Sequence, residues 1–381
     1  MDLLQDPSLF RLLLVLSVGA AFAVYTRLHL VGGGSVTGGY LAILVVTGEW
    51  STILGTALVT GLTLLVMRAV ILRVLGLPRS WQFTIAVLVG AALTGILAVV
   101  VPPYISLGEP LGIAMTFGAF VVPGLVAYDV SHQGFPQTML ALACVTGITL
   151  AVCVPAFLLL QGLPPGSTDD APFVQRIPPD LMPYAVVAVI VIGGALRFTL
   201  GLRSGGFIGA LFIVEFFSVE AFLAVGAAAL TTQLLMWFIE RRVVMTGRQR
   251  GMIALMLGAL VAWAGLYWAA ALGWLPAQEA NLYVLSPLLA TGLMAADMGR
   301  KGSDVIKTFV GTGLAALGLA ILLWVTDTYG IVVGILALLI AALGSIPGIL
   351  ALREPWRQAE RSGKARLVEL GRDTGASTPP A

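Results

Sequence analysis

Long apolar runs separated by short polar turns dominate this sequence. Runs near the ~20 residues that an α-helix needs to cross a bilayer lie at 9–28, 51–75, 82–101, 111–130, 138–160, 183–202, 219–240, 252–272, 280–297, 305–326 and 329–352. Two shorter runs, 36–48 and 206–217, follow glycine-rich openings and are interpreted as short crossings or re-entrant hairpins. The pattern predicts an all-α polytopic integral membrane protein with about 11–13 membrane segments.

The composition supports a lipid environment. Hydrophobic residues make up 59% of the 381 positions and charged residues only 10%, whereas soluble domains carry about 25% charged residues. The net charge of +2, with basic residues scattered at segment ends, argues against nucleic acid as a partner. Cys144 and Cys153 lie in one apolar run, so we expect no disulfide framework. The two histidines, His29 and His132, give no metal-ligand spacing.

Basic residues cluster in alternate turns and thereby predict an orientation by the positive-inside rule. They are Arg68, Arg73, Arg79, Arg241, Arg242, Arg248, Arg250, Arg300 and Lys301. If these turns are cytoplasmic and both short runs cross, every loop agrees with an N-terminus outside and a C-terminus in the cytoplasm. The Pro-rich loop 161–182 is then an extracytoplasmic linker, and the charged tail 353–381 is cytoplasmic.

The sequence also repeats itself. At shifts of 171 or 168 residues, several glycines and acids coincide, among them Gly38 with Gly209, Glu49 with Glu220, and Asp129 with Asp297. Matches of acidic residues at a nearly constant offset are rare by chance in so apolar a chain. We predict two parallel six-segment repeats at 1–160 and 183–327, related by an axis along the membrane normal. An extra transmembrane helix at 328–352 follows them.

Each repeat ends one helix with an acid, a polar turn and a glycine. The carboxylates of Asp129 and Asp297 can be interpreted in two ways. Either carboxylate hydrogen-bonds its own following turn, whose glycine supplies a positive φ, or it is a functional acid at a cytoplasmic mouth that water reaches. A negative charge at a helix C-terminus opposes the macrodipole, so something else must hold it. The other candidate contacts to a partner or an anionic polymer are His132, Gln133, Arg300 and Lys301.

Other acids are distinguished by their neighbours. Glu215 is flanked by bulky apolar residues, so we predict a buried charge, with Arg197 and Arg203 as the nearest candidate partners in sequence. Glu49 and Glu220 precede long helices and are predicted to cap them.

The glycine-rich openings "VGGGSVTGGY" and "RSGGFIGA" lack the Lys-Ser/Thr ending of a phosphate-binding P-loop. They either allow close helix packing or line a pathway whose free amides face an anion. With no nucleophile–base pair and no paired carboxylates, the sequence predicts no catalytic residue, metal or cofactor. The candidate structural positions are Gly38, Gly39, Tyr40, Pro123, Gly124, Gly134, Gly209, Gly292 and Gly302.

Three motifs stand out in the first half: "GGGSVTGGYLAILVV", "RVLGLPRSW" and "FVVPGLVAYDVSHQGFPQTMLAL". Over about residues 10–160 they resemble the PgsC/CapC family, the small membrane subunit of poly-γ-glutamate synthase in bacterial capsule biosynthesis. The matching positions are Gly39, Tyr40, Leu41, Val122, Pro123, Gly124, Leu125, Ala127, Gln133 and Gly134. Family members are about half as long, so this chain looks like a tandem duplication. Its second half departs from the pattern, with Leu211 in place of the tyrosine and Thr291 in place of the proline.

The resemblance implies a non-catalytic subunit, in the bacterial cytoplasmic membrane, of a complex that makes or exports an anionic polyglutamate. In the family, a cytoplasmic ATP-dependent amide ligase performs the chemistry, and an extracytoplasmic anchored subunit often completes the set. ATP is therefore expected on the ligase. The chain is also similar to seven-helix modules associated with inactive transglutaminase-like domains and ATP-grasp ligases. Two alternatives are a stand-alone secondary transporter of a small anion and a membrane enzyme acting on lipid-linked substrates.

Overall fold

The structure is a computed structural model. It describes residues 7–69, 79–100, 112–160, 177–178, 181–202, 209–211, 214, 219–272, 286–299 and 302–343. In these residues the regular structure is helical throughout. A membrane favours this outcome, because helices satisfy their own backbone hydrogen bonds where no water is available.

The helices follow the apolar runs closely. In the first half they are α1 (Pro7–Leu28), α2 (Thr37–Thr47), α3 (Trp50–Val66), α4 (Arg79–Val100), α5 (Gly112–Gln133) and α6 (Phe135–Leu160). In the second half they are α7 (Met182–Leu200), α9 (Val219–Glu240), α10 (Gly247–Ala271), α12 (Ser286–Asp297) and α13 (Gly302–Tyr329). Gly134, with φ +96°, separates α5 from α6.

Four helical stretches in the described residues are long and apolar enough to cross a membrane: Trp50–Ala69, Phe135–Pro155, Leu223–Glu240 and Gly302–Tyr329. Shorter apolar helices accompany them: Leu12–Leu28, Thr37–Thr47, Gln82–Leu97, Tyr184–Arg197 and Ile331–Leu343. The chain is therefore a helical membrane protein. The count of six segments per repeat stays a prediction, as do the domain limits.

Helix α2 is too short to cross a bilayer alone. Its 11 residues span only ~16 Å, about half of a ~30 Å hydrocarbon core. Most of its side chains between Thr37 and Leu44 are buried, because α1, α3, α5 and α6 pack around it. Protein therefore covers this short element, which suits either a short crossing or a re-entrant segment.

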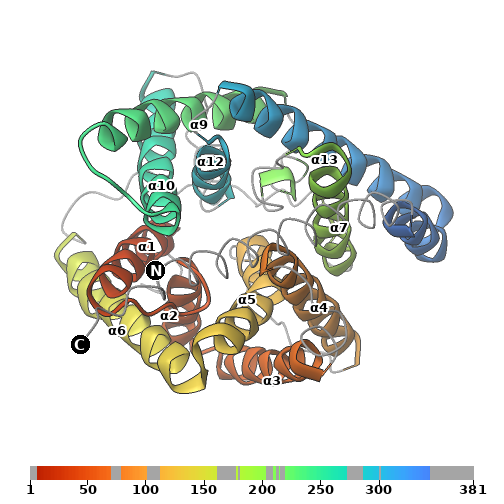
Figure 1. The fold of residues 1–381 in the computed structure, drawn as a ribbon, viewed down its shortest axis with the longest axis horizontal. Coiled ribbons are helices and arrows are strands. Elements are labelled where there is room, and N and C mark those ends of the chain that lie inside the picture. The colour runs from red at the N-terminus through yellow and green to blue at the C-terminus, as the bar shows by residue number, and fades with distance from the viewer. Residues whose placement is uncertain are drawn as a thin grey trace, which may run out of the picture.

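The two halves repeat the same packing. In the first, α4 packs on α5, α3 on α4, and α1 on α6; in the second, α10 packs on α12, α9 on α10, and α7 on α13. Figure 1 shows the halves as two groups, one below and one above the centre. Between them, α1 contacts α10 and α4 contacts α7. The counterpart of α1 is α7 and that of α10 is α4. The two contacts are therefore equivalent, as expected for a two-fold relation between the halves.

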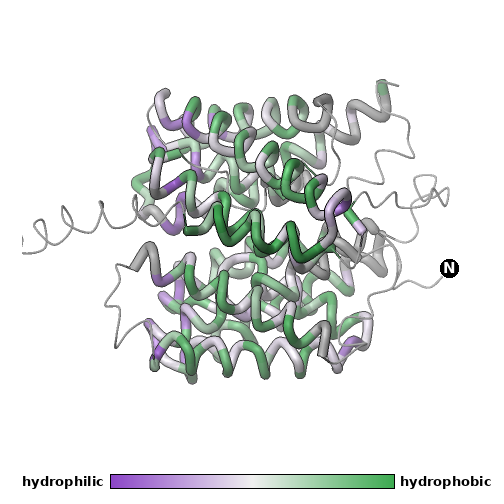
Figure 2. The backbone as a smooth tube through the Cα atoms, turned by 90° about the vertical axis from the view of Figure 1, so that its right-hand side faces the viewer, coloured by the Kyte–Doolittle hydropathy of each residue, from purple (hydrophilic) through white to green (hydrophobic). Residues whose placement is uncertain are grey.

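The hydrophilic ends of both halves lie on the same side of the molecule. Figure 2 shows most of the strongly hydrophilic residues at the left-hand ends of both layers. Parallel repeats produce this arrangement, because counterpart helices run in the same direction.

Glycines form a close helix crossing in each half. A Cβ atom added at Gly90 would lie 2.6 Å from the backbone nitrogen of Gly124, and one added at Gly258 would lie 2.4 Å from the Cα of Gly292. The two pairs occupy equivalent positions at a shift of 168 residues. Small residues permit such close packing of helices in a membrane, so the duplication preserves a backbone-to-backbone contact.

Candidate functional site

A glycine-rich loop wraps around a buried carboxylate at the hydrophilic end of the first half. The loop follows α1, and Gly33 and Gly34 have φ values of +68° and +85°. The Gly33 amide donates a hydrogen bond of 2.9 Å to Oδ2 of Asp129. The Thr37 hydroxyl donates to the Gly33 carbonyl. The loop amide thus binds a carboxylate of the same chain.

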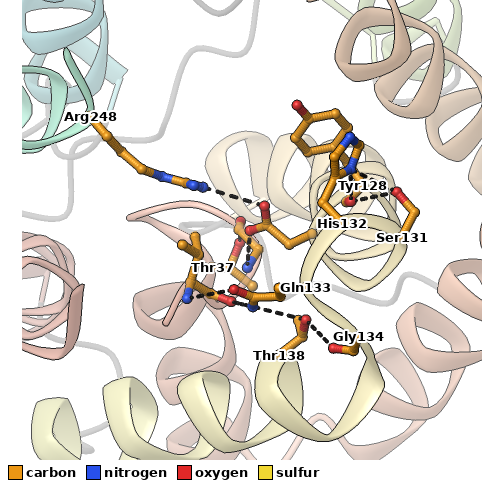
Figure 3. A network of polar contacts seen from close by, with 11 residues as sticks. Thr37, Tyr128, Ser131, His132, Gln133, Gly134, Thr138 and Arg248 are labelled. Atoms are coloured by element: carbon orange, nitrogen blue, oxygen red, sulfur yellow. Dashed lines mark hydrogen bonds and ion pairs between the residues drawn. The ribbon is translucent and has the colours of Figure 1, made fainter. Parts of the chain in front are cut away.

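The side chain of Gln133 holds the same loop from one turn further along α5. Its Oε1 accepts from the Val31 amide at 3.2 Å, and its Nε2 donates to the Val31 carbonyl. The same Nε2 donates to Oγ1 of Thr138 at 3.0 Å. Asp129 and Gln133 are four residues apart and therefore lie on one helix face. Together they attach the loop to α5 (Figure 3).

An arginine from the second half completes this site. Nη2 of Arg248 donates to Oδ1 of Asp129 at 3.3 Å, and the two side chains are 44% and 7% exposed. Thr246 and Gln249 exchange hydrogen bonds between side chain and backbone amide, a capping box that starts α10 and positions Arg248 in its first turn. Figure 3 shows Arg248 reaching across to the end of α5. We call the contact of Asp129 with Gly33 and Arg248 the inter-repeat junction.

His132 lies on another face of the same helix end. Its side chain is exposed, its Nδ1 is 2.9 Å from both the Tyr128 carbonyl and Oγ of Ser131, and its ring lies 4.3 Å from that of Tyr128. At the end of α5, Asp129 and Gln133 therefore face the loop, whereas His132 faces outward.

A second polar cluster ties together the hydrophilic ends of α9, α10 and α12. Arg250 donates from Nε to Oε1 of Glu240 at 2.5 Å, from Nη1 to the Ala296 carbonyl at 3.0 Å and from Nη2 to Oε1 of Gln233 at 3.2 Å. Gln233 in turn donates to the Gly299 carbonyl at 2.6 Å. The sequence marked Arg250 only as an orientation signal, but the structure gives it three partners.

The structure corrects the first reading of Asp129. Its carboxylate bonds the distant Gly33 and Arg248 rather than its own following turn, and it is buried, with 5% of its surface exposed. Water therefore has little access to this carboxylate, contrary to expectation, and a functional role for Asp129 stays a prediction. Asp297 ends α12 and is partly buried. In its turn the positive φ belongs to Gly299, not to Gly302, which begins α13.

The Gly-Gly-Tyr motif lies in the packed core. A Cβ atom at Gly38 would lie 2.3 Å from the side chain of Val145, and one at Gly39 would lie 2.5 Å from that of Ser17. Tyr40 is 3% exposed, and its ring fills the space beside Gly118. These contacts join α2 to α1, α5 and α6.

Of the remaining candidate site residues, some lie in the described part of the structure and others do not. Pro123 lies within α5, Gly209 has only ordinary contacts with α12 and α13, and Arg197 is exposed in the last turn of α7. Glu49 occupies the N-cap of α3, but its side chain makes no capping hydrogen bond. The positions outside the described part of the structure are Arg203, Glu215, Arg300 and Lys301, together with the side chain of Glu220.

Metal ligands do not cluster in the described part of the chain, where no group of three or more His, Cys, Asp or Glu side chains is arranged to hold an ion.

Paired helix crossings, a two-fold contact between halves and one hydrophilic end define a helical membrane protein built from a tandem repeat. Comparison with protein families identifies the repeat. The family described as capsule biosynthesis CapC matches residues 16–139 and again 187–308. These matches cover more than half of the chain, which therefore belongs to the CapC family as a tandem duplication. They begin 171 residues apart, the offset that aligns Gly38 with Gly209. No curated protein and no solved structure matches the chain.

Proposed function

We propose that this protein is the non-catalytic membrane subunit of a complex that makes or exports an anionic polymer, a poly-γ-glutamate or a related peptide polymer. Membership of a capsule biosynthesis family is the observation that carries this proposal. The hydrophilic end supports it. Exposed basic side chains occur there on several turns and suit an anionic chain or an acidic partner surface: Arg27, Arg68 and Arg248.

The hydrophilic end is, in this proposal, the cytoplasmic end in a bacterial inner membrane, with the N-terminus outside and the C-terminal tail inside. The concentration of arginines in the turns after α3 and α9 supports this orientation. A cytoplasmic ATP-dependent ligase docks on this end and binds ATP, and an extracytoplasmic anchored subunit contacts the opposite end.

The inter-repeat junction has a structural part in this proposal. Asp129 and Gln133 fix the glycine-rich loop, so the exposed residues around them keep one arrangement. His132, Asp297 and the basic turn of Arg300 and Lys301 supply the contacts to ligase or polymer. A buried, fully bonded Asp129 is a poor docking residue, because its carboxylate already accepts from Gly33 and Arg248.

The direct test is copurification from native membranes in mild detergent, followed by mass spectrometry. We expect an ATP-dependent amide ligase to remain bound, and the purified complex to form glutamate polymer when ATP is added. The subunit alone should form none. A protein that purifies without a ligase would contradict a stable complex. Anion flux in vesicles that contain only this protein would then favour the transporter.

A paired substitution localises the docking surface. R300Q with K301Q should reduce the amount of retained ligase at least tenfold, because two cationic contacts are lost together. The control removes the same charge from two exposed positions that the proposal does not use, with R197Q and K307Q, and should retain the ligase. Equal amounts of each variant in the membrane fraction establish that insertion is unchanged. Equal retention by both double variants would exclude the basic turn as the docking site.

A further inference from the structure

The outward face of α9 forms a continuous apolar stripe that ends in a cation. Leu223, Leu230, Leu234 and Trp237 are 62%, 46%, 57% and 43% exposed. From Leu230 onward they are three or four residues apart and so lie on one side of the helix. Arg241 continues the stripe by one turn, and its guanidinium carbon lies 3.4 Å from the centre of the Trp237 ring. A tryptophan beneath an arginine at the end of a lipid-facing stripe is typical of the membrane–water boundary.

The turn after this boundary holds two valines outward. Val244 is 100% exposed and Val243 is 52% exposed, and they directly follow the exposed side chains of Arg241 and Arg242. Apolar side chains on an exposed turn lose the stabilisation that burial gives, unless something outside the protein covers them.

Hydrogen bonds and packing fix this turn at both ends. The amides of Arg242 and Val243 both donate to the Ile239 carbonyl at 2.9 Å. The capping box of Thr246 begins the next helix, and Met245 packs inward against the core. The Val243–Val244 pair therefore forms an exposed apolar tip between two anchored ends.

We propose that the α9–α10 turn, residues 241–246, is a binding site for anionic phospholipid, in which Arg241 and Arg242 bind the headgroup and Val243 and Val244 enter the interface. Opposite charge favours an anionic over a zwitterionic headgroup. The valines follow directly from the lipid-facing stripe of α9, so a membrane covers them without any further partner. This continuity favours lipid over a docked protein. The site does not depend on the polymer function.

A fluorescent probe on the valine tip tests this proposal. V244C, in a C144A and C153A background, is labelled with an environment-sensitive dye and reconstituted into vesicles of phosphatidylcholine, alone or with phosphatidylglycerol. We expect blue-shifted emission and quenching by headgroup-region nitroxide lipids, both larger with phosphatidylglycerol. R241Q with R242Q should remove this dependence on phosphatidylglycerol. R197Q with K307Q, which deletes the same charge from two other exposed positions, should preserve it.

Native mass spectrometry of the unlabelled protein provides a second readout that needs no cysteine. At ~1 kcal/mol per basic residue near an anionic surface, losing two arginines should weaken phosphatidylglycerol retention by ~30-fold. A probe that emits as in water and stays unquenched in both vesicles would overturn the lipid assignment and make the turn a protein-docking surface. Unchanged retention in R241Q with R242Q would overturn the headgroup assignment.

Discussion

Replacing Gly124 by valine is expected to lower the free energy of unfolding by more than ~3 kcal/mol, the upper range for overpacking a core. A Cβ atom at this position would lie 2.5 Å from the Ala86 carbonyl oxygen and 2.5 Å from the Cα of Val87. Both are backbone atoms, so the clash cannot be relieved by rotating a side chain. Helices α4 and α5 must separate instead. Unfolding in mixed detergent and dodecyl sulfate micelles, followed by circular dichroism, measures the loss.

Two substitutions calibrate this experiment. Gly61 lies in α3 with no atom near the position of an added Cβ, so G61A should be neutral or stabilise by up to ~1 kcal/mol through helix propensity. G292V, at the equivalent crossing of the second half, should cost about as much as G124V, since its Cβ would lie 2.6 Å from the Cα of Leu255. A mild effect of G124V would mean that the two helices are not in backbone contact.

Replacing Asp129 by alanine is expected to cost ~2–4 kcal/mol. Most of this loss comes from the Gly33 amide, because a buried donor without an acceptor costs ~1–3 kcal/mol. Arg248 is 44% exposed, so its ion pair adds only ~0.5–1 kcal/mol. D129N keeps an acceptor for the amide and should therefore cost less than D129A, while R248Q should cost least. The same micelle titration measures all three variants.

A double-mutant cycle separates the ion pair from the amide contact. The coupling between D129N and R248Q should be close to the ion-pair contribution, ~0.5–1 kcal/mol. D327A removes an exposed acid from α13 and should change stability by less than ~0.5 kcal/mol. If R248Q destabilised the protein as much as D129A, or if the cycle gave no coupling, the inter-repeat junction would not act as described.

The helices could be predicted from the sequence because lipid imposes them. A long apolar run has no way to satisfy its backbone in lipid except as a helix. The predicted segment 219–240 accordingly coincides with α9, and the predicted segment 138–160 starts three residues inside α6. Glycine and acid spacing also predicted the duplication that the two family matches support.

The partners of Asp129 could not be predicted because they are far from it in the sequence. Gly33 and Arg248 lie 96 and 119 residues away in sequence, and no local pattern measures such a separation. Arg248 was interpreted only as an orientation signal, like the other arginines near the start of α10, so nothing in the sequence set it apart. The spacing of four residues places Asp129 and Gln133 on one helix face, but it does not say what that face contacts. The capping box at Thr246 was equally visible, but it locates a helix start rather than a contact.

The two-fold contact between halves has a consequence for how the chain can evolve. A homodimer encoded by one gene must carry every substitution at both of its equivalent interfaces. Fusing the copies lifts that restriction. At the shift of 168 residues, Asp129 and Arg248 correspond to Asp297 and Ser80, so the acid recurs while the cation does not. The two halves of this protein can therefore differ at equivalent positions of their contact, as these residues do, whereas two copies encoded by one gene cannot.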